Sequence, residues 1–229
     1  MRTDPPRTIV VLAKEPVPGR VKTRLTSLLS PEQAADVAAA ALGDTLEAVA
    51  AMPGEHVLVL DGSPGPWVPA GFDVVPQRAG GLDRRLAGAF EDVCARYPGP
   101  VLLVGMDTPQ LGPSLAAVDL AGQDAVLGPA EDGGFWAVGL REPDPEVFLG
   151  VPMSTATTGR AQLERMRARG LQVGMLPTLR DVDCPDDARA VSRMVPGTRF
   201  ARRWRAVSRG DDGPSGARAS GVAGAPLCR

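Results

Sequence analysis

Residues 8–25 read TIVVLAKEPVPGRVKTRL, a short apolar run followed by a polar loop. The run from Thr8 to Ala13 is rich in β-branched residues, which is typical of a strand buried on both faces. Ser30 and Pro31 then predict a helix start, with Ser30 as the N-cap and Pro31 at the first helical position. A buried strand that leads through a polar loop into a helix is the usual unit of a parallel α/β sheet.

The rest of the chain continues this alternation of strands and helices. Further strands are predicted at 56–60, 72–75, 101–105, 125–127, 135–140 and 171–176. Helices are predicted at 31–52, 82–97, 159–169 and 185–194, with a short one from Pro113 onward. We therefore predict a single α/β domain over residues 8–208, with a mostly parallel central sheet covered on both faces. Residues 1–7 and the Gly, Ala, Ser and Pro-rich residues 209–229 are expected to be disordered.

Composition and charge exclude several classes of protein. The net charge of -2 gives no electrostatic reason to expect a nucleic acid partner. No apolar run reaches membrane-spanning length and no signal-peptide pattern is present, so we expect a cytoplasmic protein without a membrane span. His56 is the only histidine and the three cysteines form no CxxC pair, which excludes histidine-rich and thiolate metal sites. The oligomeric state stays open.

The loop after the first strand holds the only two lysines among 25 basic side chains, Lys14 and Lys22. Where arginine has replaced lysine nearly everywhere, a retained lysine indicates a need for a compact point charge, as in phosphate contact. We predict that Lys14, Lys22 and Arg24 neutralise phosphate, that Thr23 donates a hydroxyl, and that Gly19 lets the loop turn its N–H groups toward the ligand. The alternative is a solvated basic turn.

Carboxylates follow two other predicted strands. Asp107 lies in VGMDTP, directly after the strand at 101–105. Asp181 and Asp183 lie in LRDVDCPDD, and because they alternate in extended chain they face the same side. Magnesium prefers one or two carboxylates and completes its shell with water and phosphate, so these positions predict a Mg²⁺ or Mn²⁺ site. The alternative is that the acids only cap turns and helices.

A fourth polar segment, GPAEDGGFW, covers residues 128–136. Two adjacent acids, Glu131 and Asp132, precede paired glycines, which would let the backbone approach a ligand closely. Phe135 and Trp136 offer a stacking surface, although one of them is expected in the core. A turn without a function would have the same composition.

Five segments together resemble a known bacterial family: AKEPVPGRVKTRL (13–25), GMDTP (105–109), GPAEDGGFWAVGL (128–140), STATT (154–158) and DVDCPDD (181–187). The family is the glycosyltransferase-A-like group called arsenosugar-biosynthesis-type or radical-SAM-associated glycosyltransferases. Phospholactate and molybdenum-cofactor guanylyltransferases are its relatives. The resemblance spans residues 8–195 and implies a three-layer nucleotide-diphospho-sugar transferase fold with a Rossmann-like nucleotide half.

The resemblance also implies roles for individual residues. The implied nucleotide site consists of Ala13, Lys14, Gly19, Lys22, Thr23, Arg24 and Gln77. Asp107 and Asp183 would hold the metal, and Lys22, Glu131 and Asp132 would be catalytic, the two acids lying near the sugar or acceptor. The chain departs from the family where Gly81 replaces an expected acid and Asp83 an expected glycine, which puts the contact to base or ribose in question.

These observations predict a Mg²⁺- or Mn²⁺-dependent transferase that takes a nucleotide or nucleotide-sugar donor and a small-molecule acceptor. Glycosyl transfer is the preferred reaction. One alternative is guanylyltransferase-like nucleotidyl transfer from a nucleoside triphosphate to a phosphorylated acceptor, and another is an inactive nucleotide-binding protein. A hydrolase that pairs Ser63 or Ser154 with His56 is disfavoured, because His56 begins a strand and no GxSxG motif is present.

Overall fold

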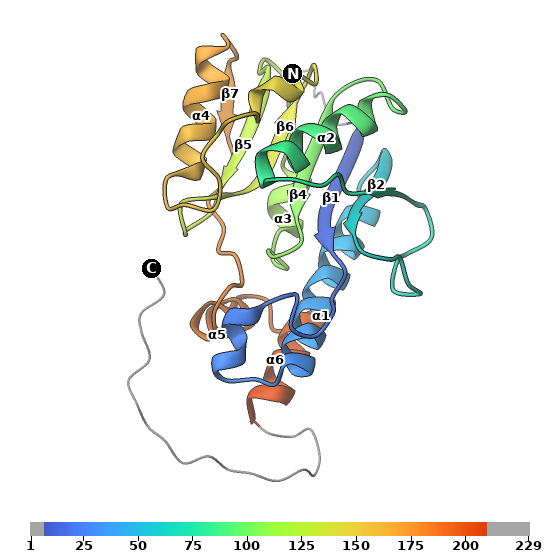
Figure 1. Ribbon diagram of the computed structural model, residues 1–229, viewed down its shortest axis with the longest axis vertical. Helices are drawn as coiled ribbons and strands as arrows, with labels where there is room; N and C mark the ends of the chain where they lie inside the picture. The colour runs from blue at the N-terminus through green and yellow to red at the C-terminus, as the bar shows by residue number, and fades with distance from the viewer. Residues whose placement is uncertain (1–6, 210–229) are drawn as a thin grey trace.

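The computed structural model describes residues 7–209, and its sheet has seven strands in the order β3-β2-β1-β4-β6-β5-β7 (Figure 1). They are β1 (Thr8–Lys14), β2 (Glu55–Asp61), β3 (Phe72–Pro76), β4 (Val101–Gly105), β5 (Ala125–Pro129), β6 (Phe135–Leu140) and β7 (Val173–Met175). β6 pairs antiparallel with both of its neighbours, whereas every other pairing is parallel. The predicted mostly parallel α/β fold is confirmed.

The predicted helices are present, and α6 is a further helix that was not predicted. The helices are α1 (Pro31–Ala50), α2 (Leu82–Cys94), α3 (Gly112–Ala116), α4 (Thr158–Ala168), α5 (Pro185–Met194) and α6 (Arg199–Arg209), with 3₁₀ turns η1 (Thr23–Ser27) and η2 (Pro145–Val147). α1 begins at Pro31, where the Ser30 hydroxyl accepts the Gln33 N–H at 3.2 Å and the Gln33 side chain accepts the Ser30 N–H at 3.0 Å. This reciprocal pair satisfies two backbone donors that a helix start leaves without partners.

The described part of the chain ends close to the predicted boundaries of the domain. α6 continues through Arg209, a residue that was predicted to belong to the disordered tail. Apart from Arg7 and Arg209, the segments predicted to be disordered lie outside the described residues. Within residues 7–209, no helix has the length and apolar character that crossing a bilayer requires.

Helices cover both faces of the sheet. Ile9 and Val11 of β1 pack in one buried cluster with α1 and α3, whereas Val10 packs in another with α2 and α4. All three side chains are at most 1% exposed, as expected for a central strand covered on both sides. This gives the three layers that the resemblance implied (Figure 1).

A third cluster lies below the sheet edge, where α1 extends past the strands. Leu25 of η1, Val37 of α1, Val191 of α5 and Trp204 of α6 belong to it. In it η1 packs against both α1 and α5, near the lower part of Figure 1. Because Lys22 immediately precedes η1 and Asp183 lies just before α5, this packing brings two predicted site residues together.

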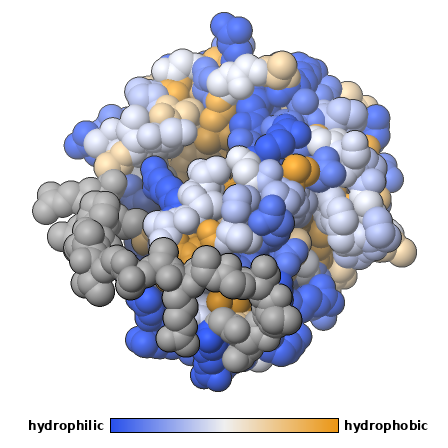
Figure 2. Space-filling model, turned by 60° about the horizontal axis from the view of Figure 1, so that its bottom comes forward, coloured by the Kyte–Doolittle hydropathy of each residue, from blue (hydrophilic) through white to orange (hydrophobic). Residues whose placement is uncertain are grey.

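The strands that precede the polar loops all end at one edge of the sheet. β1, β4, β5 and β7 point in the same direction, since β6 is antiparallel to both β4 and β5 and β7 is parallel to β5. The loops after β1, β4, β5 and β7 therefore converge at one edge of the sheet. On the face shown in Figure 2, hydrophobic residues form scattered areas within a largely hydrophilic surface.

Candidate active site

A cavity of about 550 Å³ lies at the carboxyl edge of the sheet. Its walls come from the loop after β1, the start of α2, the loops after β4, β5 and β7, and the segment before α4. The predicted residues that line it are Ala13, Lys14, Lys22, Thr23, Arg24, Gln77, Asp107, Asp132 and Asp183. Gly19 and Glu131 are not among its lining residues.

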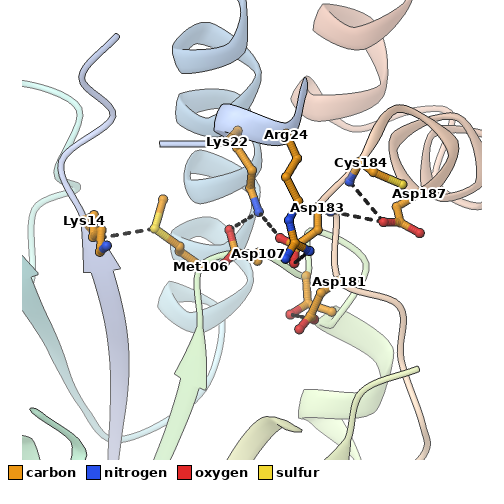
Figure 3. Close-up of polar contacts among 10 residues, drawn as sticks. Lys14, Lys22, Arg24, Met106, Asp107, Asp181, Asp183, Cys184 and Asp187 are labelled. Atoms are coloured by element: carbon orange, nitrogen blue, oxygen red, sulfur yellow. Dashed lines mark hydrogen bonds and ion pairs between the residues drawn. The ribbon is translucent and has the colours of Figure 1, made fainter. Parts of the chain in front are cut away.

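Lys22 connects the basic loop to two acidic loops. Its backbone adopts the left-handed conformation with φ 48°, and its side chain is only 6% exposed. The ammonium contacts the Asp107 carboxylate and lies 3.1 Å from the Asp183 carboxylate (Figure 3). Burial alone would lower the pKa of Lys22, but the charges of Asp107 and Asp183 outweigh burial and raise that pKa above its ordinary value.

The loops after β4 and β7 are joined directly to each other. The Val182 N–H donates to the Asp107 carbonyl at 2.9 Å, and the Thr108 hydroxyl donates to the Asp181 carboxylate at 3.2 Å. Val182 itself is 0% exposed, so the two acids beside it both face the cavity, as their alternation predicted. These contacts hold Asp107, Asp181 and Asp183 in one acidic wall.

The acidic wall perturbs one of its own members. The pKa of Asp181 is raised to about 7, mainly by burial and then by the negative charges of Asp107 and Asp132. The positive charge of Lys22 opposes this rise. The shift reflects several carboxylates gathered around one positive side chain. Arg24 adds a second positive charge, 3.7 Å from the other side of Asp183.

The carboxylates of Asp107 and Asp183 suit a hard divalent cation such as Mg²⁺ or Mn²⁺. Within residues 7–209, no group of three or more His, Cys, Asp or Glu side chains is arranged to hold a metal ion. Two carboxylates nevertheless match magnesium, which takes one or two and completes its shell with water and phosphate oxygens. The Lys22 ammonium contacts both carboxylates, so a cation bound there would have to share them with Lys22.

The two acids of the segment 131–134, Glu131 and Asp132, lie in different surroundings. Asp132 lines the cavity, and its carboxylate accepts the Gly134 N–H at 2.8 Å. Glu131 instead forms an ion pair with Arg180 at 2.5 Å, so the structure brings only Asp132 of the two predicted catalytic acids to the cavity. Adjacent residues in a turn point in different directions, which the sequence alone did not resolve.

The two paired glycines differ: Gly134 lines the cavity, whereas Gly133 is needed for packing. Gly133 has φ 90°, and a Cβ at that position would overlap the backbone carbonyl of Ala156. The Gly159 N–H donates to the Gly133 carbonyl at 2.8 Å, so the two segments interlock. Glycine is required here because another segment of the chain approaches closely.

The two aromatic residues after these glycines also differ in role. Trp136 is 1% exposed and its indole N–H donates to the Pro177 carbonyl at 2.9 Å, which makes it part of the core although its edge reaches the cavity. Phe135 is half-buried and also lines the cavity. The expectation that one of the pair belongs to the core is confirmed.

Several lining residues had no role in the predicted nucleotide, metal or catalytic sites. They are the cations Arg20 and Arg85 and the hydroxyl residues Ser154, Thr155 and Thr158. Arg85 hydrogen-bonds the side-chain oxygen of Gln77, whose amide nitrogen in turn donates to the Val59 carbonyl at 3.4 Å. The sequence did carry one signal for Arg85 as a site residue, because Arg85 lies in the first turns of a helix that starts at the carboxyl edge of the sheet.

The altered segment at the start of α2 has a structural role. Asp83 accepts the Gly150 N–H at 3.2 Å, which lowers the pKa of the Asp83 carboxyl. Neither Gly81 nor Asp83 lines the cavity, whereas Leu82 does. Asp83 therefore ties α2 to the chain that leads into residues 154–158.

His56 lies away from the cavity. Its Nε2 is 3.0 Å from the Met52 carbonyl, and its ring packs against Phe72 with centroids 5.4 Å apart. It sits near the amino end of β2, opposite the carboxyl edge where the lining residues gather. The geometry gives no support to a hydrolase with His56 as its base.

A family model described as an uncharacterized protein conserved in bacteria (DUF2064) matches residues 33–155. The chain belongs to this family. The DUF2064 match includes Asp107 and Asp132, while Lys22 and Asp183 lie outside it.

The chain is also 30% identical over 127 residues to a 2-phospho-L-lactate guanylyltransferase from Methanoregula boonei. The match covers 55% of this chain and 56% of that protein, so the chain spans about half the length of the curated relative. These findings agree with the family resemblance that the sequence motifs indicated.

Solved structures support the same fold for this DUF2064 protein. A protein of Desulfovibrio desulfuricans G20, provisionally described as a nucleotide-diphospho-sugar transferase, is 26% identical with a TM-score of 0.77. The likeness covers 89% of this chain and 94% of that one. The inositol-1-phosphate CTP transferase of T. maritima is 12% identical with a TM-score of 0.51, covering 86% and 99% of the two chains, and shows the fold alone.

Proposed function

We propose that this DUF2064 protein is a metal-dependent transferase that uses a nucleotide-activated donor and transfers a glycosyl group to a small molecule. The observation that carries the proposal is the Lys22 ammonium, held between Asp107 and Asp183 where a basic loop meets an acidic wall. The likeness to a nucleotide-diphospho-sugar transferase structure over 89% of the chain supports it.

The donor phosphates would lie against the loop after β1. Lys14 is exposed and lines the cavity, and the side chains of Arg20 and Arg24 are 60% and 70% exposed, so all three can turn toward a ligand. Thr23 adds a hydroxyl beside Lys22. Cations on a loop directly after a strand are suited to bind phosphate oxygens.

Asp107 and Asp183 would hold the Mg²⁺ or Mn²⁺ ion. Both carboxylates are 39% exposed; Asp107 can keep Lys22 as a neighbour while presenting its other oxygen, whereas the other oxygen of Asp183 lies 3.7 Å from Arg24, which would have to turn away. When bound, the cation would neutralise negative charge on the leaving phosphates. Lys22 and Arg24, which already lie at this point, would stabilise the same charge from the protein side.

Asp132 is the candidate general base for glycosyl transfer. The acceptor hydroxyl would attack the anomeric carbon as the bond from that carbon to the phosphate oxygen breaks, and the electron pair would leave with the nucleoside diphosphate. Asp132, which lines the cavity and is held by the Gly134 N–H, would receive the hydroxyl proton.

Nucleotidyl transfer is the second candidate, because the Methanoregula relative is named a guanylyltransferase. In that reaction a phosphorylated acceptor attacks the α-phosphorus of a nucleoside triphosphate and pyrophosphate leaves. No protein base is needed for an acceptor that is already an anion. The two candidates therefore differ in donor, leaving group and acceptor charge.

A thermal-shift panel followed by product analysis tests the proposal. Nucleoside di- and triphosphates and their sugars are each added with and without Mg²⁺ or Mn²⁺, and a donor that binds should raise the melting temperature by mass action. Release of nucleoside diphosphate would support glycosyl transfer and release of pyrophosphate the second candidate. A nucleotide-dependent shift without turnover would leave an inactive binding protein. No shift with any nucleotide would contradict the proposal.

The metal requirement has its own test. Asp107→Ala should abolish the metal-dependent part of the shift, while Asp186→Ala, at a 76% exposed carboxylate of the neighbouring helix, should not change it. Full activity of Asp107→Ala in the presence of a chelator would rule the metal out.

A further inference from the structure

The carboxylates that would bind the metal are already paired with two cations of the basic loop. The Lys22 ammonium contacts Asp107 and lies 3.1 Å from one oxygen of Asp183 (Figure 3). Arg24 lies 3.7 Å from the other oxygen of Asp183. Two positive side chains therefore balance the charge of two negative ones, and a divalent cation placed between them would meet neighbours of its own sign.

The two side-chain cations differ in how strongly they hold these carboxylates. The Lys22 side chain is only 6% exposed, so its ion pairs are less screened by solvent than those of a surface lysine. Arg24 is 70% exposed, and an ion pair made by such a side chain contributes little. Lys22 is therefore the main competitor of a divalent cation for Asp107 and Asp183.

The backbone at Lys22 is held in place, whereas its side chain lies within reach of a ligand. The Leu25 N–H donates to the Lys22 carbonyl at 2.9 Å, and Leu25 itself is 0% exposed in the third buried cluster. Lys22 also lines the cavity, next to Thr23 and on the same loop as Lys14. Because the lysine stem is long and flexible, the ammonium can turn from a carboxylate to a phosphate oxygen while the loop stays in place.

We propose that Lys22 takes the place of the divalent cation on Asp107 and Asp183 until donor phosphates bind, so that donor and cation bind cooperatively. The inference rests on the proposed function, in which phosphates and cation meet at these residues. Phosphate oxygens would give the Lys22 ammonium a new partner and release the carboxylates for the cation. Since coupling between two ligands is reciprocal, the cation strengthens donor binding by the same factor. Uptake of the cation is thereby tied to the arrival of the donor.

Mn²⁺ binding without nucleotide tests the proposal, because it separates the competition with Lys22 from any contact between metal and phosphate. Mn²⁺ alone is titrated at low ionic strength, and the loss of the EPR signal of free Mn²⁺ gives its affinity. Lys22→Met removes the charge but keeps an apolar stem, and should raise the affinity for Mn²⁺ about tenfold or more. Lys22→Arg, which keeps the charge, should bind Mn²⁺ as weakly as the wild-type protein. An unchanged or lower affinity in Lys22→Met would overturn the proposal.

A matched control removes a positive charge elsewhere in the neighbourhood. Arg189 pairs with Asp186 at 2.5 Å on α5, the helix that follows Asp183. Arg189→Met should change the affinity for Mn²⁺ by less than about twofold, because exposed charges are screened. A rise as large as that in Lys22→Met would show a general effect of charge and contradict the competition.

One more measurement separates the proposal from the proposed function. Calorimetry compares the affinity of the wild-type protein for the nucleoside diphosphate that gives the largest thermal shift, with and without Mn²⁺. If Mn²⁺ raises that affinity but Lys22→Met binds Mn²⁺ no better than the wild type, this inference fails and the proposed function stands. If Mn²⁺ has no effect on nucleotide affinity, both fail.

A second variant covers the case in which Lys22→Met folds poorly. Arg24→Met changes a largely exposed side chain and should raise the affinity for Mn²⁺ alone about threefold, a smaller effect because solvent screens Arg24. No rise in Arg24→Met would then overturn the proposal.

Discussion

The two walls of the cavity differ in construction as well as in charge. The basic wall comes mainly from one continuous loop, and its arginines are largely exposed, with Arg24 70% exposed. The acidic wall of Asp107, Asp181 and Asp183 is assembled from two loops that are distant in sequence, and contacts such as the hydrogen bond from the Val182 N–H to the Asp107 carbonyl at 2.9 Å fix it. A set of exposed cations can adjust to bind a phosphate, while a set of acids fixed by hydrogen bonds can hold a ligand in one position. Lys22 belongs to the basic loop in sequence and to the acidic wall in space.

The largest expected effect separates the two lysines of the basic loop. Lys22→Met should lower kcat/KM roughly 10²–10³-fold, because it removes a cation placed where charge develops. Lys14→Met should cost only about tenfold, since Lys14 is exposed and other cations share its role. Steady-state kinetics with the donor found in the nucleotide panel measure both. Equal losses of kcat/KM in the two variants would contradict the different roles given to Lys22 and Lys14.

The loop after β5, which carries Asp132, should be sensitive to its packing against residue 156. Gly133→Ala should lower the free energy of unfolding by about 2–4 kcal/mol, because it combines a strained φ with overlap against Ala156. Gly170→Ala is the control, with a similar φ of 81° and no neighbour within 4 Å, and should cost about 1 kcal/mol. Urea unfolding measures both. A Gly133→Ala cost no larger than that of the control would contradict the packing role.

The crowding of acids predicts a pH dependence of stability in metal-free protein. The pKa of Asp181 is raised to about 7, well above its value in an unfolded chain, so the folded state holds a proton that the unfolded state has lost. The contribution of Asp181 to the free energy of unfolding is therefore fully present below about pH 4. It is lost as the pH rises to about 7, at up to about 1.4 kcal/mol per pH unit. Asp181→Asn in a chelating buffer should flatten this slope. An unchanged slope would mean that Asp181 titrates normally.

The smallest expected effect concerns a single hydrogen bond within the acidic wall. Thr108→Val keeps the shape of a side chain that is 1% exposed but removes the donor to Asp181. The free energy of unfolding should fall by about 0.5–1.5 kcal/mol. Thermal unfolding compares it with Thr26→Val, whose hydroxyl donates to the Thr23 carbonyl on an exposed turn. A smaller effect for Thr108 than for Thr26 would contradict the contact.

The fold and the meeting of the loops were predictable from the sequence because both follow from local patterns. Apolar runs such as 8–13 and 101–105 identify buried strands, and parallel strands bring their carboxyl ends to one edge. That rule alone predicts that Lys22, Asp107 and Asp183 lie near one another. The alternation of Asp181 and Asp183 likewise predicts that both face the cavity.

Features that depend on packing between distant segments were not predictable. Gly133 is needed because Ala156 approaches it, and nothing in residues 128–136 indicates that contact. α6 was not predicted as an element, although Phe200 and Trp204 lie on its buried face against α1 and α5. The direction of Glu131 also depends on a long-range partner, Arg180.

The central claim is that donor phosphates lie on the basic loop while a cation bridges them to the acidic wall. A crystal structure with Mn²⁺ and the nucleoside diphosphate selected by the thermal-shift panel tests it most directly. We expect phosphate oxygens in contact with Lys14, Lys22 or Arg24, and Mn²⁺ bound by Asp107, Asp183 or both. A nucleotide whose phosphates lie elsewhere, or Mn²⁺ bound away from both acids, would contradict the account.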